Sequence, residues 1–227
     1  MKPFLTFCLL TATSFFVPVA AAEKDKTQPL AIYCAVYADG LKTVFVKTGK
    51  DSYQSVALSS ANVVTAKESM VADGKVSLHG PGAGDENYPV VAIADVSGHR
   101  QALLIMAAGK KGGDMAYETK VVEGDMSEFP MGTFKMVNLA PHPVRITSGG
   151  EVVEIKAGED YLYKQSAAAG TAVPVTIDHK AGDDWQLVSS TQWAARNDRR
   201  TLVCFLLDAN SGRMVVKSVP LRGAASR

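Results

Sequence analysis

The chain has 227 residues, 47% of them hydrophobic, and carries 24 basic against 23 acidic side chains. This length corresponds to one large or two small domains, either of which can bury a core without metals or many disulfides. The near-zero net charge excludes the strongly basic surface that attracts nucleic acid or anionic membranes.

The first residues have the pattern of an export signal. Lys2 gives a positive start, residues 4–19 form an apolar run, and Ala20–Ala22 are small residues before Glu23. The run is shorter than the ~20 residues that a membrane-spanning helix needs. We therefore interpret residues 1–22 as a cleaved signal peptide. The mature chain is expected in the periplasm or the extracellular space, without membrane insertion.

From Leu30 onward the sequence consists of short β-type runs separated by Gly, Asp, Asn and Pro. The runs are LAIYCAVY, TVFVKT, VVAIADV, ALLIMAA, TFKMVNL, EVVEIKA, VPVTIDH, TLVCFLL and MVVKSVP. Strands that recur every roughly 8–15 residues with turn signals between them predict an all-β, antiparallel β-sandwich. Residues 102–106 and 202–207 are apolar throughout, which predicts central strands covered on both faces.

Two stretches of the chain resemble each other at an offset of 100 residues. HRQALLIM (99–106) aligns with RRTLVCFL (199–206), and each is followed by a polar turn with glycine and then another apolar strand. Residues 32–46 resemble residues 133–146 near the same offset. Self-similarity of this kind predicts two similar β units packed together.

The predicted joint between the two units lies at residues 126–132, where Pro130 and Gly132 interrupt the strand pattern. The units would then span residues 23–125 and 126–227. The joint has no Ser/Gly-rich or Pro-rich spacer, so we expect the halves to be fixed against each other. The sequence leaves open whether they form two domains or one continuous domain.

A compact polar cluster follows the strand TFKMVNL. Pro141 and Pro143 break the strand because proline donates no backbone hydrogen bond, and Pro143 favours an extended backbone at His142. Asn138 can close the turn with its side-chain amide. We interpret the cluster as a turn between two strands and not as a chemical site.

Motifs for metal binding and catalysis are absent from the sequence. No two histidines have the short spacing of metal ligands, so we predict neither a metal nor another cofactor. There is no G-x-S-x-G nucleophile motif. A polymer hydrolase with a site between the halves is a weaker hypothesis, and its candidate residues are too scattered to name as catalytic. They are Asp95, His99, Asp178 and His179.

Two cysteines remain after signal cleavage, Cys34 and Cys204, both inside apolar runs. An oxidising compartment permits a disulfide between them. The alternative is two separately buried thiols, because a thiol behaves as a small hydrophobic group. The sequence leaves this choice open.

The segment WQLVSSTQWAARNDRRTL (185–202) holds the only two tryptophans, close to several arginines. Aromatic rings beside arginines can bind sugars or anionic groups by stacking and bidentate hydrogen bonds. The candidate ligand-binding residues are Trp185, Trp193, Arg196, Arg199 and Arg200. We favour the alternative that the tryptophans fill the core and Asp198 pairs with an arginine.

Three stretches carry a resemblance to an uncharacterised family of secreted bacterial β-rich proteins. They are FPMGTFKMVNL (129–139), the following PVR strand with its KAG turn, and DDWQLVSSTQWAARNDRRTLV (183–203). The resemblance covers chiefly residues 100–220 and implies the same β-hairpins. It implies no activity and no catalytic residues.

The sequence therefore favours an exported, non-catalytic β-sandwich protein that binds a protein or glycan of the cell envelope. The alternatives are the hydrolase named above and a structural component of a surface assembly whose exposed strand edges pair with neighbours. The ligand and the oligomeric state are left open.

Overall fold

The computed structural model describes residues 26–82, 88–208 and 211–222. These residues form sixteen β-strands in four sheets of four strands and no helix, which confirms the predicted all-β sandwich class. In the same three ranges there is no helix long and apolar enough to cross a membrane. The predicted signal peptide, residues 1–22, lies outside the described residues.

The first unit contains the first eight strands. They are β1 (Lys26–Cys34), β2 (Thr43–Gly49), β3 (Ser52–Ala57), β4 (Val64–Val71), β5 (Lys75–His79), β6 (Val90–Asp95), β7 (Ala102–Ala108) and β8 (Tyr117–Glu123). One sheet has the order β4-β1-β7-β8 and the other the order β3-β2-β5-β6.

The second unit contains the other eight strands. They are β9 (Thr133–Asn138), β10 (Val144–Ser148), β11 (Glu151–Ile155), β12 (Asp160–Lys164), β13 (Ala172–Ala181), β14 (Asp184–Ala194), β15 (Arg199–Leu207) and β16 (Met214–Arg222). Its sheets have the orders β12-β9-β15-β16 and β11-β10-β13-β14.

The two units share one topology. Each strand of the first unit occupies the same sheet position as the strand eight numbers later in the second. The parallel pair β1–β7 of the first unit recurs as β9–β15, and the other pairings are antiparallel. The predicted joint at residues 126–132 falls between β8 and β9.

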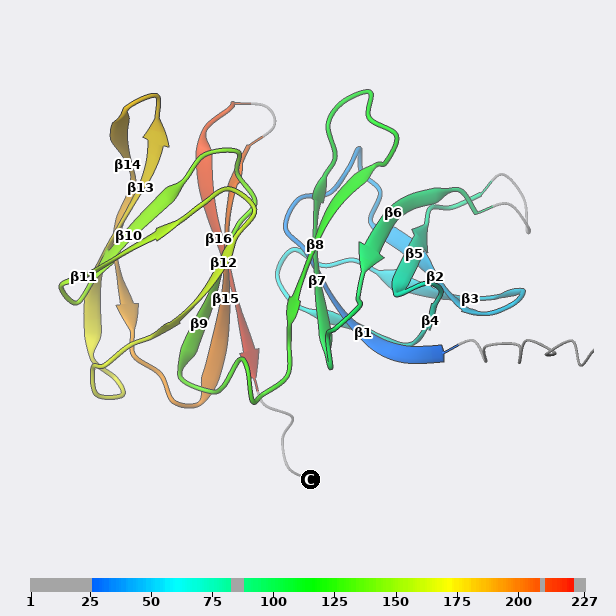
Figure 1. Cartoon of the computed structure of the whole chain (residues 1–227), viewed down its shortest axis with the longest axis horizontal. Helices are drawn as coiled ribbons and strands as arrows, with labels where there is room; N and C mark the ends of the chain where they lie inside the picture. The colour runs from blue at the N-terminus through cyan, green and yellow to red at the C-terminus, as the bar shows by residue number, and fades with distance from the viewer. Residues whose placement is uncertain (1–25, 83–87, 209–210, 223–227) are drawn as a thin grey trace, which may run out of the picture.

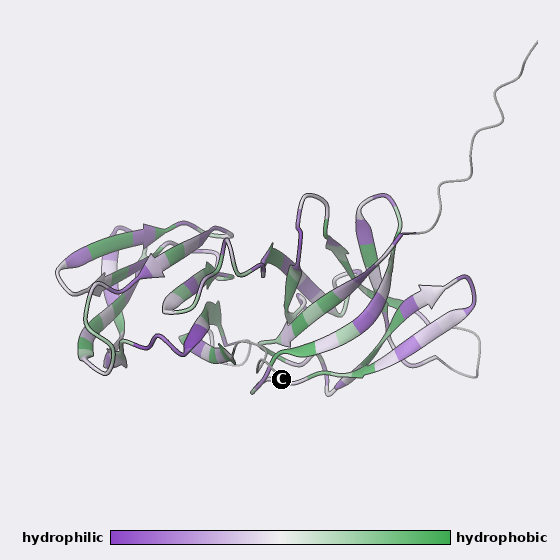
Figure 2. Cartoon of the chain, turned by 90° about the horizontal axis from the view of Figure 1, so that it is seen from below, coloured by the Kyte–Doolittle hydropathy of each residue, from purple (hydrophilic) through white to green (hydrophobic). Residues whose placement is uncertain are grey.

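The four sheets are stacked in layers. Figure 1 shows the sheets β4-β1-β7-β8 and β12-β9-β15-β16 facing each other at the middle of the molecule, with the other two sheets at its far ends. Hydrophobic and hydrophilic residues alternate in bands along the strands of both units (Figure 2). This alternation follows from the period of two by which a strand presents its side chains to opposite faces.

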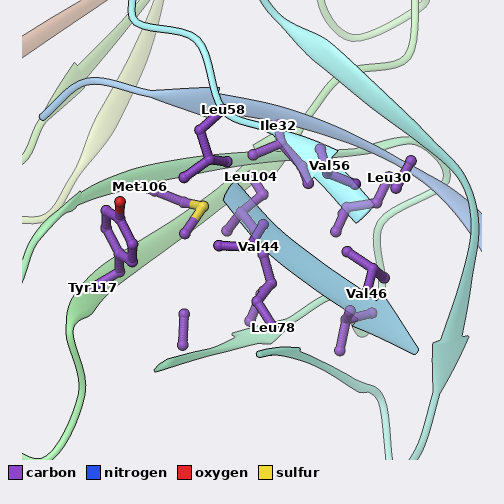
Figure 3. Packing of buried hydrophobic residues seen from close by; sticks show 14 of the residues in the cluster. Leu30, Ile32, Val44, Val46, Val56, Leu58, Leu78, Leu104, Met106 and Tyr117 are labelled. Carbon is purple, nitrogen blue, oxygen red and sulfur yellow. The ribbon is translucent and has the colours of Figure 1, made fainter. Parts of the chain in front are cut away.

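Three hydrophobic clusters fill the spaces between the layers. The cluster inside the first unit includes Leu30, Val44, Leu78 and Leu104, which converge between its two sheets (Figure 3). A second cluster lies inside the second unit. The third lies between the units and joins residues of β1 and β7 to residues of β9 and β15. We call it the inter-unit core.

Strands β7 and β15 each contribute to two of these clusters. In β7, Leu104 belongs to the cluster inside the first unit and Leu103 to the inter-unit core. In β15, Val203 lies inside the second unit and Cys204 in the inter-unit core. Residues 102–106 are buried throughout, as predicted, and so is the predicted run 202–207 except for Leu207 at its end, which is half-buried. The 100-residue alignment nevertheless has the wrong register. It matches Leu104, which faces the core inside its unit, with Cys204, which faces the inter-unit core, and a shift of one residue would match side chains on equivalent faces.

The two cysteines are free and buried, and no disulfide joins them. The reason is visible in the packing, since Cys34 points into the cluster inside the first unit whereas Cys204 points into the inter-unit core. The disulfide left open by the sequence is therefore not formed in this structure. Burial raises the pKa of the Cys34 thiol to about 11 and that of Cys204 also well above its usual value.

The connection between the units is fastened to both of them. Phe129 is fully buried in the inter-unit core. The guanidinium of Arg200 on β15 donates hydrogen bonds to the carbonyls of Gly124 (2.6 Å) and Phe129 (3.0 Å), and it lies 5.0 Å from the Phe129 ring centroid. These contacts hold the connection against the second unit.

Candidate functional site

A groove of about 610 Å³ opens where the two units meet. We call it the inter-unit groove. Its apolar lining comes from both units and consists of Val36, Ala107, Ala108, Leu139, Ala140, Pro141, Leu206 and Leu207. Its polar lining comes mostly from the first unit and includes Lys110, Lys111, Glu118, Thr119 and Lys120. The volume lies within the range of small-ligand pockets, roughly 300–1,000 Å³.

The first-unit wall is formed by the end of β7 and the loop that follows it. Gly109 donates to the carbonyl of Ala116 at 2.8 Å, and a Cβ at this position would approach the Met115 carbonyl oxygen to 2.5 Å. Only glycine permits this close approach of two chain segments. The loop then turns with a hydrogen bond from Gly113 to the Lys110 carbonyl (2.9 Å). This geometry places two exposed lysines at the rim.

The second-unit wall is the turn that follows β9. Asn138 is fully buried, and its side-chain nitrogen donates to the carbonyls of His142 (2.8 Å) and Ile155 (3.0 Å). Its side-chain oxygen accepts the backbone N–H of Ala140 (3.0 Å). The predicted turn is confirmed, and Asn138 organises it as expected. The same turn presents Pro141 to the inter-unit groove.

The lysines of the inter-unit groove differ in their partners. Lys120 lies 3.8 Å from the Asp160 carboxylate of the second unit, which also accepts a hydrogen bond from the largely buried Lys135 at 3.3 Å. Lys110 and Lys111 are exposed and form no ion pair with any described residue. The rim thus carries, beside an apolar lining, two positive charges that no described carboxylate pairs with.

The five residues predicted from the Trp–Arg segment do not form one patch. Trp193 is half-buried in the second unit, where its ring stacks on Phe134 at 4.9 Å between centroids. The Arg145 guanidinium lies over the Trp185 ring, 4.5 Å from the ring centroid. Arg145 also forms an ion pair with Asp178 at 3.0 Å. Arg145 alternates along β10 with core residues, so Trp185 is on the outer face of that sheet.

The three arginines of the segment are also held by the protein. The Asp198 carboxylate forms ion pairs with the guanidinium groups of Arg196, at 2.8 Å, and Arg199, at 3.1 Å. Hydrogen bonds from Arg196, and to a smaller extent from Arg199, hold the pKa of Asp198 well below its usual value. Arg200 faces the connection between the units, as described above. The Asp198 ion pairs and the half-buried Trp193 agree with the structural interpretation that the sequence favoured. Trp185 does not, because it lies on the outer face of its sheet and does not fill the core.

The residues considered for a hydrolase lie in separate places. Asp95 accepts a hydrogen bond from the Ser97 hydroxyl, which lowers its pKa, and His99 contacts the Ser97 carbonyl at 3.1 Å. These residues belong to the first unit. In the second unit, Asp178 is paired with Arg145, and the next residue, His179, has a buried Nδ1 without a hydrogen-bond partner.

The described residues contain no group of three or more His, Cys, Asp or Glu side chains that could hold a metal ion. The sequence suggested a site between the halves only for the hydrolase hypothesis, and none of the candidate site residues that it named lines the inter-unit groove. The walls of the groove are an ordinary β-hairpin loop and an ordinary turn, which only the packing of the units brings together. Comparison of the sequence with models of protein families and with curated proteins found no match.

Proposed function

We propose that this chain is an exported, non-catalytic binding protein of the cell envelope whose inter-unit groove holds an apolar ligand with a negative charge. The observation that carries the proposal is the combination of an apolar lining from both units with two rim lysines, Lys110 and Lys111, that form no ion pair with the described part of the chain. Apolar contact supplies affinity in such a pocket, and a few polar groups fix the orientation.

The electrostatics of the groove favour an anion. Lys120 lies near the Asp160 carboxylate, so the positive charge of Lys120 is already partly balanced. Lys110 and Lys111 have no such carboxylate among the described residues, and only Glu118 on the same rim opposes them. A carboxylate or phosphate beside the two ammonium groups would gain Coulomb energy that weakens with ionic strength.

The experiment is a binding titration with a medium-chain fatty acid, with the alcohol of the same chain length as the uncharged control. The fatty acid is expected to bind more tightly, and added salt should reduce the difference. Lys110→Glu/Lys111→Glu should weaken fatty-acid binding by about tenfold or more, as expected for two lost charge contacts. The matched control Lys50→Glu/Lys67→Glu changes two exposed lysines outside the groove and should leave binding unchanged.

A second variant tests the position of the site. Ala108→Trp places a large ring in the groove and should abolish binding of both the acid and the alcohol, while circular dichroism confirms that the protein remains folded. Equal binding by wild type and Ala108→Trp would show that the ligand does not occupy the inter-unit groove, and the proposal would be rejected.

A further inference from the structure

Strand β14 (Asp184–Ala194) is the longest of the sixteen strands, with 11 residues, and it forms one edge of the sheet β11-β10-β13-β14. Its sequence from Trp185 to Ala194 contains neither a charged residue nor a proline. An edge strand presents a row of unpaired backbone N–H and C=O groups, which is a template for another strand. Figure 1 shows β14 at the end of the molecule away from the first unit.

The other edges of the second unit carry the features that prevent strand pairing. Strand β11 on the opposite edge of the same sheet has five residues and includes Glu151 and Glu154. Strand β16 contains Lys217 and Pro220. Charges and prolines on edge strands oppose association with a further strand. Strand β14 lacks these protections over ten consecutive residues.

The counterpart of β14 in the first unit, β6, is partly closed. There the Thr119 hydroxyl of the neighbouring sheet donates to the Ile93 carbonyl at 2.7 Å. Among the described residues, no side chain forms a hydrogen bond with the backbone of β14. The solvent-exposed residues of this edge include Leu187, which is 63% exposed. The two units therefore differ in how far this edge is covered.

We propose that β14 pairs with β14 of a second copy of this chain, antiparallel and across a two-fold axis near Thr191. The register of β14 on β13 shifts between Ile177 and Asp178, whose partners are Ser189 and Leu187. The extra residue, Val188, forms a bulge that bends the strand. The regular segment is therefore Ser189–Trp193, and Thr191 is its centre.

The charges at the two ends of β14 indicate a second copy in antiparallel orientation. Asp183 and Asp184 make the start of the strand acidic, whereas Arg196, Asp198 and Arg199 beyond its end carry one net positive charge. Antiparallel pairing brings the acidic end of each copy beside the net positive end of the other, whereas parallel pairing would place like charges together. The same register puts Thr191 opposite Thr191 and Ser190 opposite Gln192, pairs of uncharged residues that can hydrogen-bond across the strands.

The proposal is independent of ligand binding in the inter-unit groove, because β14 contributes no residue to that groove. Sedimentation equilibrium of the wild-type mature chain should show a concentration-dependent dimer. Thr191→Lys would place two ammonium groups opposite each other at the axis and should raise the dimer dissociation constant by about tenfold or more. Thr65→Lys, at an exposed position on the edge strand β4, is the matched control and should keep the dimer.

A cross-linking variant gives a second readout that does not depend on weakening the dimer. Thr191→Cys should form a disulfide-linked dimer under mild oxidation, because directly opposed residues of antiparallel strands lie within the range of a disulfide. Thr65→Cys should stay monomeric on a non-reducing gel. A wild type that remains monomeric at all concentrations would overturn the proposal. So would a dimer that neither Thr191→Lys weakens nor Thr191→Cys cross-links.

Removal of the acidic end tests the orientation. Asp183→Asn/Asp184→Asn should weaken the dimer at low ionic strength and have little effect at high salt, because the contact between the ends is electrostatic. An unchanged dissociation constant at low salt would reject the antiparallel register.

Discussion

The cores inside the two sandwiches and the inter-unit core are built from different sets of strands. Inside each sandwich, both sheets of the unit supply residues. Between the units, the central strands β1, β7, β9 and β15 provide most of the buried residues, together with Phe129 from the connection. The same central strands therefore serve two cores at once. Such sharing makes the junction an internal part of the fold, unlike a contact between independently moving domains.

The inter-unit core has a border of charged side chains. Lys135 is 8% exposed and reaches Asp160, which in turn lies near Lys120 of the first unit. Arg200 is directed at two carbonyls of the connection. Buried charges require partners, so these contacts also specify how the units are oriented. The comparison predicts that the junction is as resistant to unfolding as either sandwich.

The largest effect is expected from truncating the aromatic residue of the junction. Phe129→Ala should lower the free energy of unfolding by about 3–5 kcal/mol, because it removes a fully buried ring from a packed core. Phe134→Ala, inside the second sandwich, is the matched comparison and should cost a similar amount. Denaturant unfolding followed by circular dichroism measures both. A much smaller effect of Phe129→Ala, or two separate transitions in the wild type, would show that the units unfold independently.

A smaller effect is expected at the cysteines. Cys204→Ser buries a hydroxyl in the inter-unit core and should cost about 1–3 kcal/mol of stability. Cys34→Ser should cost less, because the Cys34 thiol already lies 3.4 Å from the Val36 carbonyl, which a serine hydroxyl can use as an acceptor. Thermal unfolding of the two variants measures the difference. An equal loss of stability in the two variants would show that the Val36 carbonyl does not stabilise the serine hydroxyl at position 34.

The same two thiols give a chemical test of burial. Burial keeps their pKa values above neutral pH, so neither should react with a thiol reagent at pH 8 in the native protein. Both should react fully after unfolding in guanidinium. Rapid reaction of Cys204 before unfolding would mean that the junction opens readily. It would contradict the prediction that the junction resists unfolding as much as either sandwich.

The sequence predicted the class of the fold because its signals are local. Period-two alternation, turn residues and fully apolar runs marked most strands, and of the predicted run 202–207 only the terminal Leu207 is not fully buried. The arrangement of side chains around β14 was not predictable in the same way. Trp185 and Trp193 are eight residues apart, which places them on one face of a regular strand. The bulge at Val188 moves them to opposite faces.

The candidate site was less predictable than the fold. The turn at Asn138 could be read from its prolines, but its position beside the loop of Lys110 depends on how the inner sheets pack. The two cysteines occupy similar apolar strands, and only the alternation of faces directs Cys34 and Cys204 into different cores. Such features depend on register, which a single residue changes.

A modest effect is expected from the carboxylate that holds the start of the connection. Glu123 accepts backbone N–H groups of Arg100 (2.8 Å), Gln101 (3.0 Å) and Asp125 (2.8 Å). Glu123→Gln should cost about 1 kcal/mol near neutral pH, because an amide offers fewer acceptor sites than a carboxylate. Urea unfolding of the two proteins at pH 7 measures this difference.

The pH dependence of that difference follows from the Glu123 pKa. Burial opposes ionisation, but the three backbone donors outweigh it and lower the pKa of Glu123 in the folded protein. Its contribution is therefore present above the unfolded pKa of about 4.3 and is lost as the pH falls through the lower folded pKa. The stability gap between wild type and Glu123→Gln should narrow below about pH 4. A gap that stayed constant down to acid unfolding would show that the carboxylate charge contributes nothing.

The smallest effect is expected at Asp198, although its pKa is strongly lowered. The Asp198 carboxylate and the Arg196 guanidinium are both about half exposed, at 56% and 47% of their side-chain surface. Water and salt screen such a pair, and ordering the two side chains costs entropy. Asp198→Asn should therefore leave the thermal midpoint nearly unchanged at moderate salt. A loss as large as that of Glu123→Gln would indicate that Asp198 also orients Arg199 at the start of β15, and that a surface ion pair supports the junction after all.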